Sequence, residues 1–131
     1  MKKATTGVEP LELVRAAARA IKDKKGLDVV ILEVGPLIVI TDYFVIGAGT
    51  NPRQIDTIAA EVIKRVEGTG GSVYATHGLE SAHWVLIDCG SVVVHVFDPD
   101  TRDLYDLEHL WADAARVEIE APEDHRARRD G

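Results

Sequence analysis

Residue types that bind metals or act as nucleophiles gather in the second half of the chain. His77, His83 and His95 surround the single cysteine, Cys89. Their spacing matches no standard zinc pattern, and the sequence places no base beside Cys89 to activate it as a nucleophile. Cys89 is interpreted as a turn thiol and His95 as a hydrogen-bonded packing or interface residue. No catalytic residue, metal or cofactor is expected here.

Acidic residues offer two further chemistries, and both patterns are incomplete. Asp98, Asp100 and Asp103 resemble the start of a calcium loop, but its twelfth position is His109 rather than glutamate. A nucleotidyltransferase needs two carboxylates on one strand to hold its divalent metal, and Asp88 is the only acid in its strand. Neither pattern predicts a metal site.

The stretch GAGTNP, residues 47–52, lies between a predicted strand and a predicted helix. That arrangement points backbone N–H groups at a phosphate. Pro52 stands where a dinucleotide fingerprint has its third glycine, and no Gly-Lys-Ser/Thr follows. A tight strand-to-helix turn explains the glycines. Because none of these patterns forms a catalytic site, the protein is not expected to be an enzyme. A nucleotide-binding or nucleotidyltransferase-like enzyme that uses the Gly47–Asn51 loop is the alternative function.

The stretch from Trp84 to Trp111 is the one around which the other elements are arranged. Two apolar runs rich in β-branched residues flank Cys89-Gly90, and glycine at the second central position favours a two-residue hairpin loop. The predicted cross-strand pairs are Asp88 with Ser91, Ile87 with Val92, Leu86 with Val93, Val85 with Val94, and Trp84 with His95.

Alternation along these strands gives the hairpin two unlike faces. One is uniformly apolar and is predicted to be core: Val85, Ile87, Val92, Val94 and Val96. The other mixes aromatic and polar side chains: Trp84, Leu86, Asp88, Ser91, Val93, His95 and Phe97. Interfaces are enriched in such residues, so this second face is the candidate partner-binding site. The alternative is an ordinary helix-covered face with Trp84 stacked on His95.

Acidic residues crowd the segment after the hairpin: Asp98, Asp100, Asp103, Asp106, Glu108 and Asp113. Arg102 is the only arginine or lysine among them. Leu104, Leu107 and either Leu110 or Trp111 recur at helical spacing, which predicts a short helix beside the hairpin with an acidic outer surface. An aromatic face bordered by acid favours a basic partner.

The chain of 131 residues, 46% of them hydrophobic and 28% charged, has the length and composition of one globular domain. The lone cysteine excludes an internal disulfide, and residues 1–7 are too short and polar for a signal peptide, so a cytoplasmic location is expected. No apolar run reaches membrane-spanning length. The net charge of −7 argues against DNA or bare RNA as the main partner.

Helices are predicted from Pro10 until Gly26, and from Pro52, capped by Asn51 with Gln54, until Gly68. Strands are predicted over 27–34, 37–40, 43–48 and 72–75. Together with the hairpin and the last helix they predict an α/β sandwich of two or three layers, with a mixed five- to six-stranded sheet, an antiparallel edge hairpin and flanking helices. Residues 1–8 are expected to be a flexible N-terminus, 9–115 the domain and 116–131 a disordered polar tail.

Five motifs also occur in a fixed order. They are Asp42-Tyr43-Phe44-Val45-Ile46 with Gly49-Thr50, Arg53, Trp84-Val85-Leu86-Ile87-Asp88, Val92-Val93-Val94-His95-Val96-Phe97, and Tyr105-Asp106-Leu107-Glu108-x-Leu110-Trp111. In this order and spacing they resemble the ribosomal silencing factor family RsfS, also called the Iojap-like family. The resemblance covers about Pro10 to Ala114.

The resemblance implies a non-enzymatic factor on a nucleotidyltransferase-like fold that lacks the metal-binding acids. It implies binding to the large ribosomal subunit through large-subunit ribosomal protein fourteen, which sterically blocks joining of the small subunit and represses translation under nutrient limitation. It also implies a homodimer in the free state. The partner-binding residues carried over by motif are Trp84, Asp88, His95, Phe97, Arg102, Tyr105, Leu107 and Trp111.

The chain departs from the family pattern at His77, where glutamate is usual, at Cys89, often tyrosine, and at Ser91, often aspartate. Two of the three lie at the hairpin turn, so the departures concern contacts made by that tip. A plain dimerisation scaffold, which would not bind ribosomes, is the third hypothesis.

Overall fold

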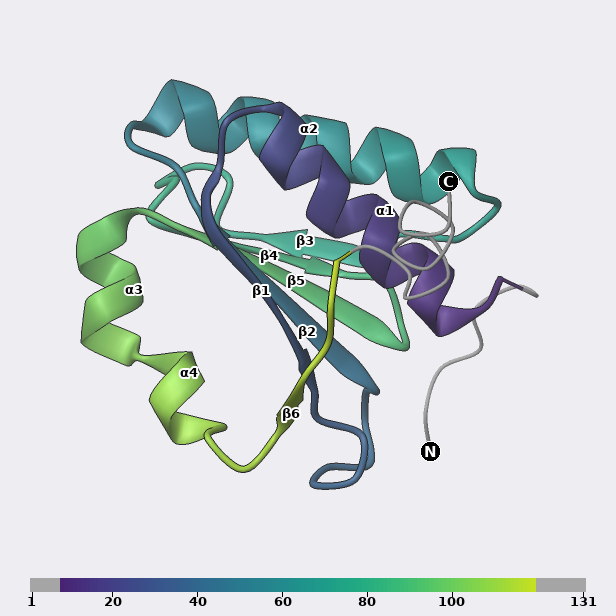
Figure 1. Cartoon of the computed structure of the whole chain (residues 1–131). Helices are drawn as coiled ribbons and strands as arrows, with labels where there is room; N and C mark the ends of the chain where they lie inside the picture. The colour runs from purple at the N-terminus through teal and green to yellow at the C-terminus, as the bar shows by residue number, and fades with distance from the viewer. Residues whose placement is uncertain (1–7, 120–131) are drawn as a thin grey trace, which may run out of the picture.

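Figure 1 shows one sheet with helices on both faces, in a computed structural model that describes residues 8–119. In chain order the elements are α1 (Pro10–Asp23), β1 (Leu27–Glu33), β2 (Tyr43–Ala48), α2 (Pro52–Gly68), β3 (Ala75–His77), β4 (Trp84–Asp88), β5 (Val92–Phe97), α3 (Pro99–Tyr105), α4 (Leu107–Leu110) and β6 (Ala115–Arg116). Helices α1 and α2 lie across one face, and α3 and α4 lie on the other side. The predicted α/β sandwich is confirmed.

The strands of the described residues form one sheet in the order β3-β4-β5-β2-β1-β6. The central strands β2 and β5 run parallel, and every other neighbouring pair is antiparallel. The mixed sheet is as predicted. The hairpin β4–β5, however, does not form the edge, because β3 pairs with β4 on its outer side.

The cap of α2 joins the two long helices. The Asn51 side chain accepts a hydrogen bond from the Gln54 N–H at 2.9 Å, which confirms the predicted cap, and Gln54 Oε1 accepts from the Thr50 N–H at 2.6 Å. The Gln54 amide also donates to the carbonyls of Lys24 and Lys25 at 3.2 and 3.0 Å. These donors satisfy carbonyls at the end of α1, which would otherwise lack partners.

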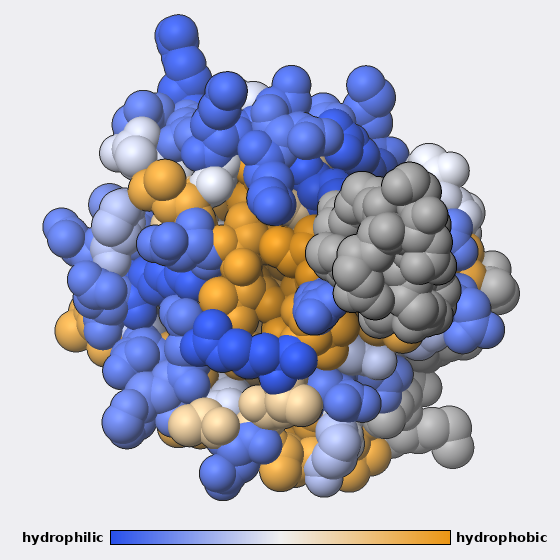
Figure 2. Space-filling model, in the orientation of Figure 1, coloured by the Kyte–Doolittle hydropathy of each residue, from blue (hydrophilic) through white to orange (hydrophobic). Residues whose placement is uncertain are grey.

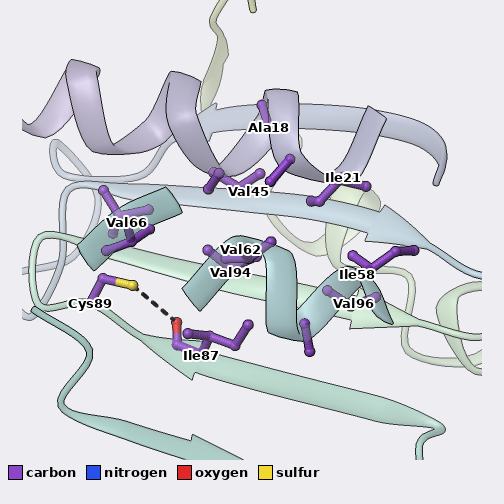
Figure 3. Packing of buried hydrophobic residues seen from close by; sticks show 14 of the residues in the cluster. Ala18, Ile21, Val45, Ile58, Val62, Val66, Ile87, Cys89, Val94 and Val96 are labelled. Atoms are coloured by element: carbon purple, nitrogen blue, oxygen red, sulfur yellow. Dashed lines mark hydrogen bonds between the residues drawn. The ribbon is translucent and has the colours of Figure 1, made fainter. Parts of the chain in front are cut away.

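The main core lies between the sheet and helices α1 and α2. Figure 3 shows Ile21 of α1 and Ile58 and Val62 of α2 packed over the central strands. The predicted core face of the hairpin is confirmed, since each of its members is at most 1% exposed: Val85, Ile87, Val92, Val94 and Val96. Cys89 closes this core at one end, and burial raises the pKa of its thiol to about 12. Such a thiol is a packing group rather than a nucleophile.

Two predicted strands differ from the structure. No strand forms over 37–40, because the N–H groups of Leu37 and Ile38 turn back to the carbonyl of Val34 at 2.8 and 3.0 Å. The segment is a loop between β1 and β2 that leaves Val39 and Ile40 exposed. The short strand predicted over 72–75 lies instead at Ala75–His77.

The C-terminal part of the chain is also more divided than predicted. Asp106 has a left-handed backbone, with φ of 48°, and it separates α3 from α4 where one helix was predicted. Arg116 then pairs with Leu32 in the sheet, and Val117 and Ile119 pack on the main core. Residues 116–119 thus belong to the packed domain, whereas 120–131 and 1–7 lie outside the described residues.

The outer edge of the sheet has an apolar surface. Figure 2 shows hydrophobic residues gathered in the middle of this view, over the position of β1 in Figure 1, with hydrophilic residues around them. Apolar side chains of β1 and of the segment after β6, together with Arg116 and Glu118, line a shallow depression there: Val29, Val30, Ile31, Val117 and Ile119. The two-residue β6 covers only the second half of β1.

Candidate partner-binding face

The register of the hairpin decides which side chains meet on the candidate face. The observed pairs are Trp84 with Phe97, Leu86 with His95 and Asp88 with Val93. The predicted register is therefore wrong by two residues, because the turn is centred on Gly90-Ser91, one residue later than the predicted Cys89-Gly90. A shift of two keeps every side chain on its predicted face, since the side-chain period of a strand is two.

The displaced turn has its own hydrogen bonds. The Cys89 N–H donates to the carbonyl of Val92 at 2.8 Å, and the Gly90 N–H donates to the Asp88 carboxylate at 2.9 Å. Gly90 has φ of 87°, a left-handed conformation that suits glycine. Asp88 is half-buried and shapes the turn.

Aromatic rings form a continuous chain across this face. The ring centroids of Tyr105 and Trp84 are 4.7 Å apart, and those of Trp84 and His95 are 6.0 Å apart. His95 then meets Phe44 at 4.7 Å, and Phe44 meets Trp111 at 5.6 Å, both edge to face. The five rings connect the end of α3 with the residue that comes after α4. We call this set, Trp84, Tyr105, Trp111 and the buried His95 and Phe44 behind them, the aromatic face.

His95 lies inside the aromatic face. It is 4% exposed, and burial lowers the pKa of its imidazole to about 4. Its Nδ1 accepts a hydrogen bond from the indole Nε1–H of Trp84 at 3.1 Å. The ring is therefore neutral at physiological pH and fixed as a hydrogen-bond acceptor.

Helix α3 is held against the sheet by Arg102, which is 9% exposed. Its guanidinium donates to the carbonyls of Leu27 and Asp28 at 3.3 and 2.7 Å and to the Glu108 carboxylate at 2.9 Å. The Asp98 carboxylate caps the start of the same helix by accepting from the Thr101 N–H at 2.7 Å. These bonds fix the position of the helix that carries Tyr105.

The surface beyond the aromatic face is both apolar and acidic. Leu104 and Leu110, which are 77% and 69% exposed, lie on α3 and α4. The exposed acids of the same segment are Asp100, Asp103, Asp106 and Asp113. Exposed leucines of this kind, rimmed by one sign of charge, are typical of a surface that meets a protein partner.

The structure divides the predicted partner-binding residues into three groups. Tyr105 is 52% exposed. The half-buried residues are Trp84, Asp88, Leu107 and Trp111. The buried residues are His95, Phe97 and Arg102.

Leu104 and Leu110 are surface residues that the sequence patterns did not predict. Helical spacing put Leu104 on the inner stripe of a single helix, whereas the left-handed Asp106 ends α3 and changes the orientation of α4. One feature of the sequence did indicate their exposure. The leucines of this segment lie among acidic residues, which a buried helix face does not require.

The Gly47–Asn51 loop has a packing role. A Cβ at Gly47 would overlap the side chain of Ile21, and a Cβ at Gly49 would overlap that of Ile55. The glycines therefore allow α1 and α2 to approach the end of β2. Asn51 is occupied by the helix cap. Within residues 8–119 there is also no group of three or more histidine, cysteine or acidic side chains placed to hold a metal ion.

Comparison with known proteins gives the family. A family model described as "Ribosomal silencing factor during starvation", RsfS, matches residues 8–131. The chain belongs to this family. The resemblance read from the motifs is thereby confirmed, and the relatives are named as silencing factors and not as enzymes.

Two curated relatives carry the name of the family, and a third is named for assembly of the large ribosomal subunit. The ribosomal silencing factor RsfS of Halalkalibacterium halodurans is 44% identical over 109 residues, covering 83% of this chain and 93% of the relative. That of Bacillus subtilis is 37% identical over 108 residues, covering 82% and 92%. A mouse relative, "Mitochondrial assembly of ribosomal large subunit protein 1", is 31% identical over 94 residues, covering 70% of this chain and 41% of its own length.

Solved structures show the same fold. A crystal structure of a Chromobacterium violaceum protein has a TM-score of 0.78 at 35% identity, covering 80% of this chain and 88% of that one. A Bacillus halodurans protein has a TM-score of 0.71 at 41% identity, covering 82% and 97%. Among the described residues, no helix is both long enough and apolar enough to cross a bilayer.

Proposed function

We propose that this RsfS protein binds the large ribosomal subunit through large-subunit ribosomal protein fourteen, using the aromatic face, and that it thereby blocks joining of the small subunit when nutrients are limiting. It acts by occupying space and not by catalysis. Free in the cytoplasm it is a homodimer. The observation that carries the proposal is the aromatic face itself, with Tyr105, Leu104 and Leu110 exposed beside it.

The composition of the face supports a protein partner. Tyrosine and tryptophan are enriched among the residues that dominate binding energy at interfaces, and Trp84 and Tyr105 lie in direct ring contact. Both belong to structured elements already held by ring contacts and hydrogen bonds. Little conformational entropy is then lost when the partner binds.

The charge supports a basic partner. The protein carries a net charge of −7, and four exposed aspartates lie on the segment that borders the face. Ribosomal RNA repels such a surface, whereas a basic patch of a ribosomal protein attracts it and speeds association. The proposed contact is therefore with protein on the large subunit.

Sucrose-gradient sedimentation tests the proposal. Purified large and small subunits are mixed with and without this protein, and the fractions are blotted for it. The expected result is that the protein travels with large subunits and depletes the joined particle. A protein that stays at the top of the gradient contradicts ribosome binding, and calorimetry with nucleotides and Mg²⁺ then tests the alternative at the Gly47–Asn51 loop.

Two variants locate the contact on the proposed face. Trp84→Ala should weaken binding by about 2 kcal/mol or more, which is about thirtyfold in affinity. Tyr74→Ala is the matched control, because Tyr74 is 43% exposed, precedes the edge strand β3 and is not a member of the aromatic face. If Tyr74→Ala releases the protein and Trp84→Ala does not, the aromatic face is the wrong surface.

A further inference from the structure

One hydrogen bond within the aromatic face joins a residue at the surface to a residue inside. The indole Nε1–H of Trp84, which is half-buried, donates to Nδ1 of His95, which is 4% exposed. We propose that His95 is a positioning residue, which fixes the orientation of Trp84 for the ribosomal partner and does not touch that partner. This inference rests on the proposed function, because it assigns how the same face is kept ready to bind.

His95 is itself held on two sides. Its ring stacks on Phe97 with 10° between the planes and 6.1 Å between centroids. Phe44 meets it edge on, at 79° and 4.7 Å. Phe97 and Phe44 are 1% and 9% exposed, so neither can move aside easily. The acceptor nitrogen is therefore fixed in space by the fold.

The other contacts of Trp84 do not choose its orientation. Phe97 and Tyr105 lie at 4.9 and 4.7 Å from its ring, at tilts of 30° and 47°. Such ring contacts tolerate a range of angles and do not by themselves require the indole N–H to point at an acceptor. The hydrogen bond to His95 adds that requirement, because the Nε1–H edge of the indole must face Nδ1 at 3.1 Å. It is the contact that selects one orientation.

The remaining nitrogen of His95 shows that this arrangement has a cost. Because Nδ1 accepts from Trp84, the proton of the neutral ring lies on Nε2. That nitrogen is buried and has no hydrogen-bond partner among the described residues. A buried unsatisfied donor destabilises the fold, and an apolar side chain of similar size would avoid it. Histidine at this position therefore orients Trp84 but lowers the stability of the fold.

The test separates positioning from simple packing. His95→Leu keeps an apolar side chain and removes the acceptor. It is expected to weaken binding to purified large subunits roughly fivefold, the usual effect of one hydrogen bond, while the melting temperature changes little, because the unsatisfied Nε2–H and the acceptor of Trp84 are removed together. His95→Gln supplies an amide oxygen to the indole and should recover part of the affinity.

A double-mutant cycle with Trp84→Phe identifies the route of the effect. Phenylalanine has no N–H group, so His95→Leu should cost nothing further in that background. In NMR spectra of the free protein, the indole Nε1–H signal that disappears in Trp84→Phe is the signal of Trp84. The signal that remains is that of Trp111. The Trp84 signal should exchange with solvent faster in His95→Leu than in the unaltered protein.

Each contrary result has its own meaning. If Trp84→Ala releases large subunits but His95→Leu binds as well as the unaltered protein, positioning is overturned and the proposed function stands. If His95→Leu costs as much in the Trp84→Phe background, or lowers the melting temperature in proportion to affinity, His95 acts by packing or direct contact and positioning is again overturned. If Trp84→Ala stays bound, the aromatic face and this inference both fail.

Discussion

Gly78 lies so close to Trp84 that a Cβ at this position would overlap the Trp84 carbonyl oxygen. The backbone of Gly78 also has φ of +88°, which side chains of L-residues rarely adopt. Glycine is thus required at the point where the connection from β3 passes the first residue of β4. The position of Trp84 depends on that close approach.

Gly78→Ala is expected to destabilise the fold by more than about 1 kcal/mol, because the conformation is strained and the carbonyl must move. Chemical denaturation measures the change. Gly68→Ala is the matched control, since Gly68 ends α2 and a Cβ there would meet nothing within 4 Å. That variant should be stabilised by about 0.5 kcal/mol. Equal effects of the two changes would contradict the role assigned to Gly78.

Arg102→Met is expected to lower the free energy of unfolding by about 3 kcal/mol, because it leaves Glu108 and two backbone carbonyls without their donor. Arg116→Met removes the other arginine near Glu108, at 3.8 Å and with 64% of its side chain exposed. An exposed pair contributes roughly 1 kcal/mol or less. Denaturant titration of both variants gives the comparison, and a larger loss in Arg116→Met would show that Arg102 does not anchor α3.

Leu104→Glu and Leu104→Lys test the basic partner. Both remove the same exposed leucine, which is 77% exposed, so the fold should tolerate both. Glutamate keeps the sign of the surrounding surface, whereas lysine opposes it. Association of the lysine variant with large subunits should be slower than that of the glutamate variant, and the difference should shrink as salt is raised. A faster lysine variant would indicate an acidic partner such as RNA.

His95 makes stability depend on pH. Burial lowers its pKa from 6.5 to about 4, so the unfolded chain binds a proton that the folded chain does not. Its contribution to stability is then fully present above pH 6.5 and is lost as the pH falls towards 4. The full loss is about 3 kcal/mol. Denaturant titrations at pH 7 and pH 4.5 should show it, and His95→Leu should remove this part of the slope. An unchanged slope in His95→Leu would contradict the assignment.

The hairpin shows what sequence patterns determine. Alternation placed Val85 and Ile87 in the core and Trp84 and His95 on the other face, and an error of two residues in the register left this result intact. The face of the sheet on which a side chain lies depends on local periodicity, which can be read from the sequence. Register depends on which residues form the centre of the turn, and the pair Cys89-Gly90 did not reveal that the turn is centred on Gly90-Ser91.

The aromatic face and the helices beside it depend on contacts that local sequence patterns do not predict. Arg102 is bound to carbonyls of Leu27 and Asp28, far from it in the sequence, so its anchoring role has no local signal. The burial of His95 depends on how α3 and α4 cover the sheet, and that depends on the left-handed backbone of Asp106.

The loop between β1 and β2 is a separate case. Leu37 and Ile38 are apolar like the residues of a strand, but their N–H groups bond to the carbonyl of Val34 and not to a neighbouring strand.

The parallel pairing of β2 with β5 has a consequence for how the chain folds. The hairpins β1–β2 and β4–β5 each close over a short connection, whereas Tyr43 and Val92 come together only after α2 and β3 have been brought round. Nonlocal closure slows folding more than local closure does. The docking of two preformed hairpins along their central seam is therefore expected to be the slow step. A nascent chain cannot join its two hairpins until β5 has left the ribosome that made it.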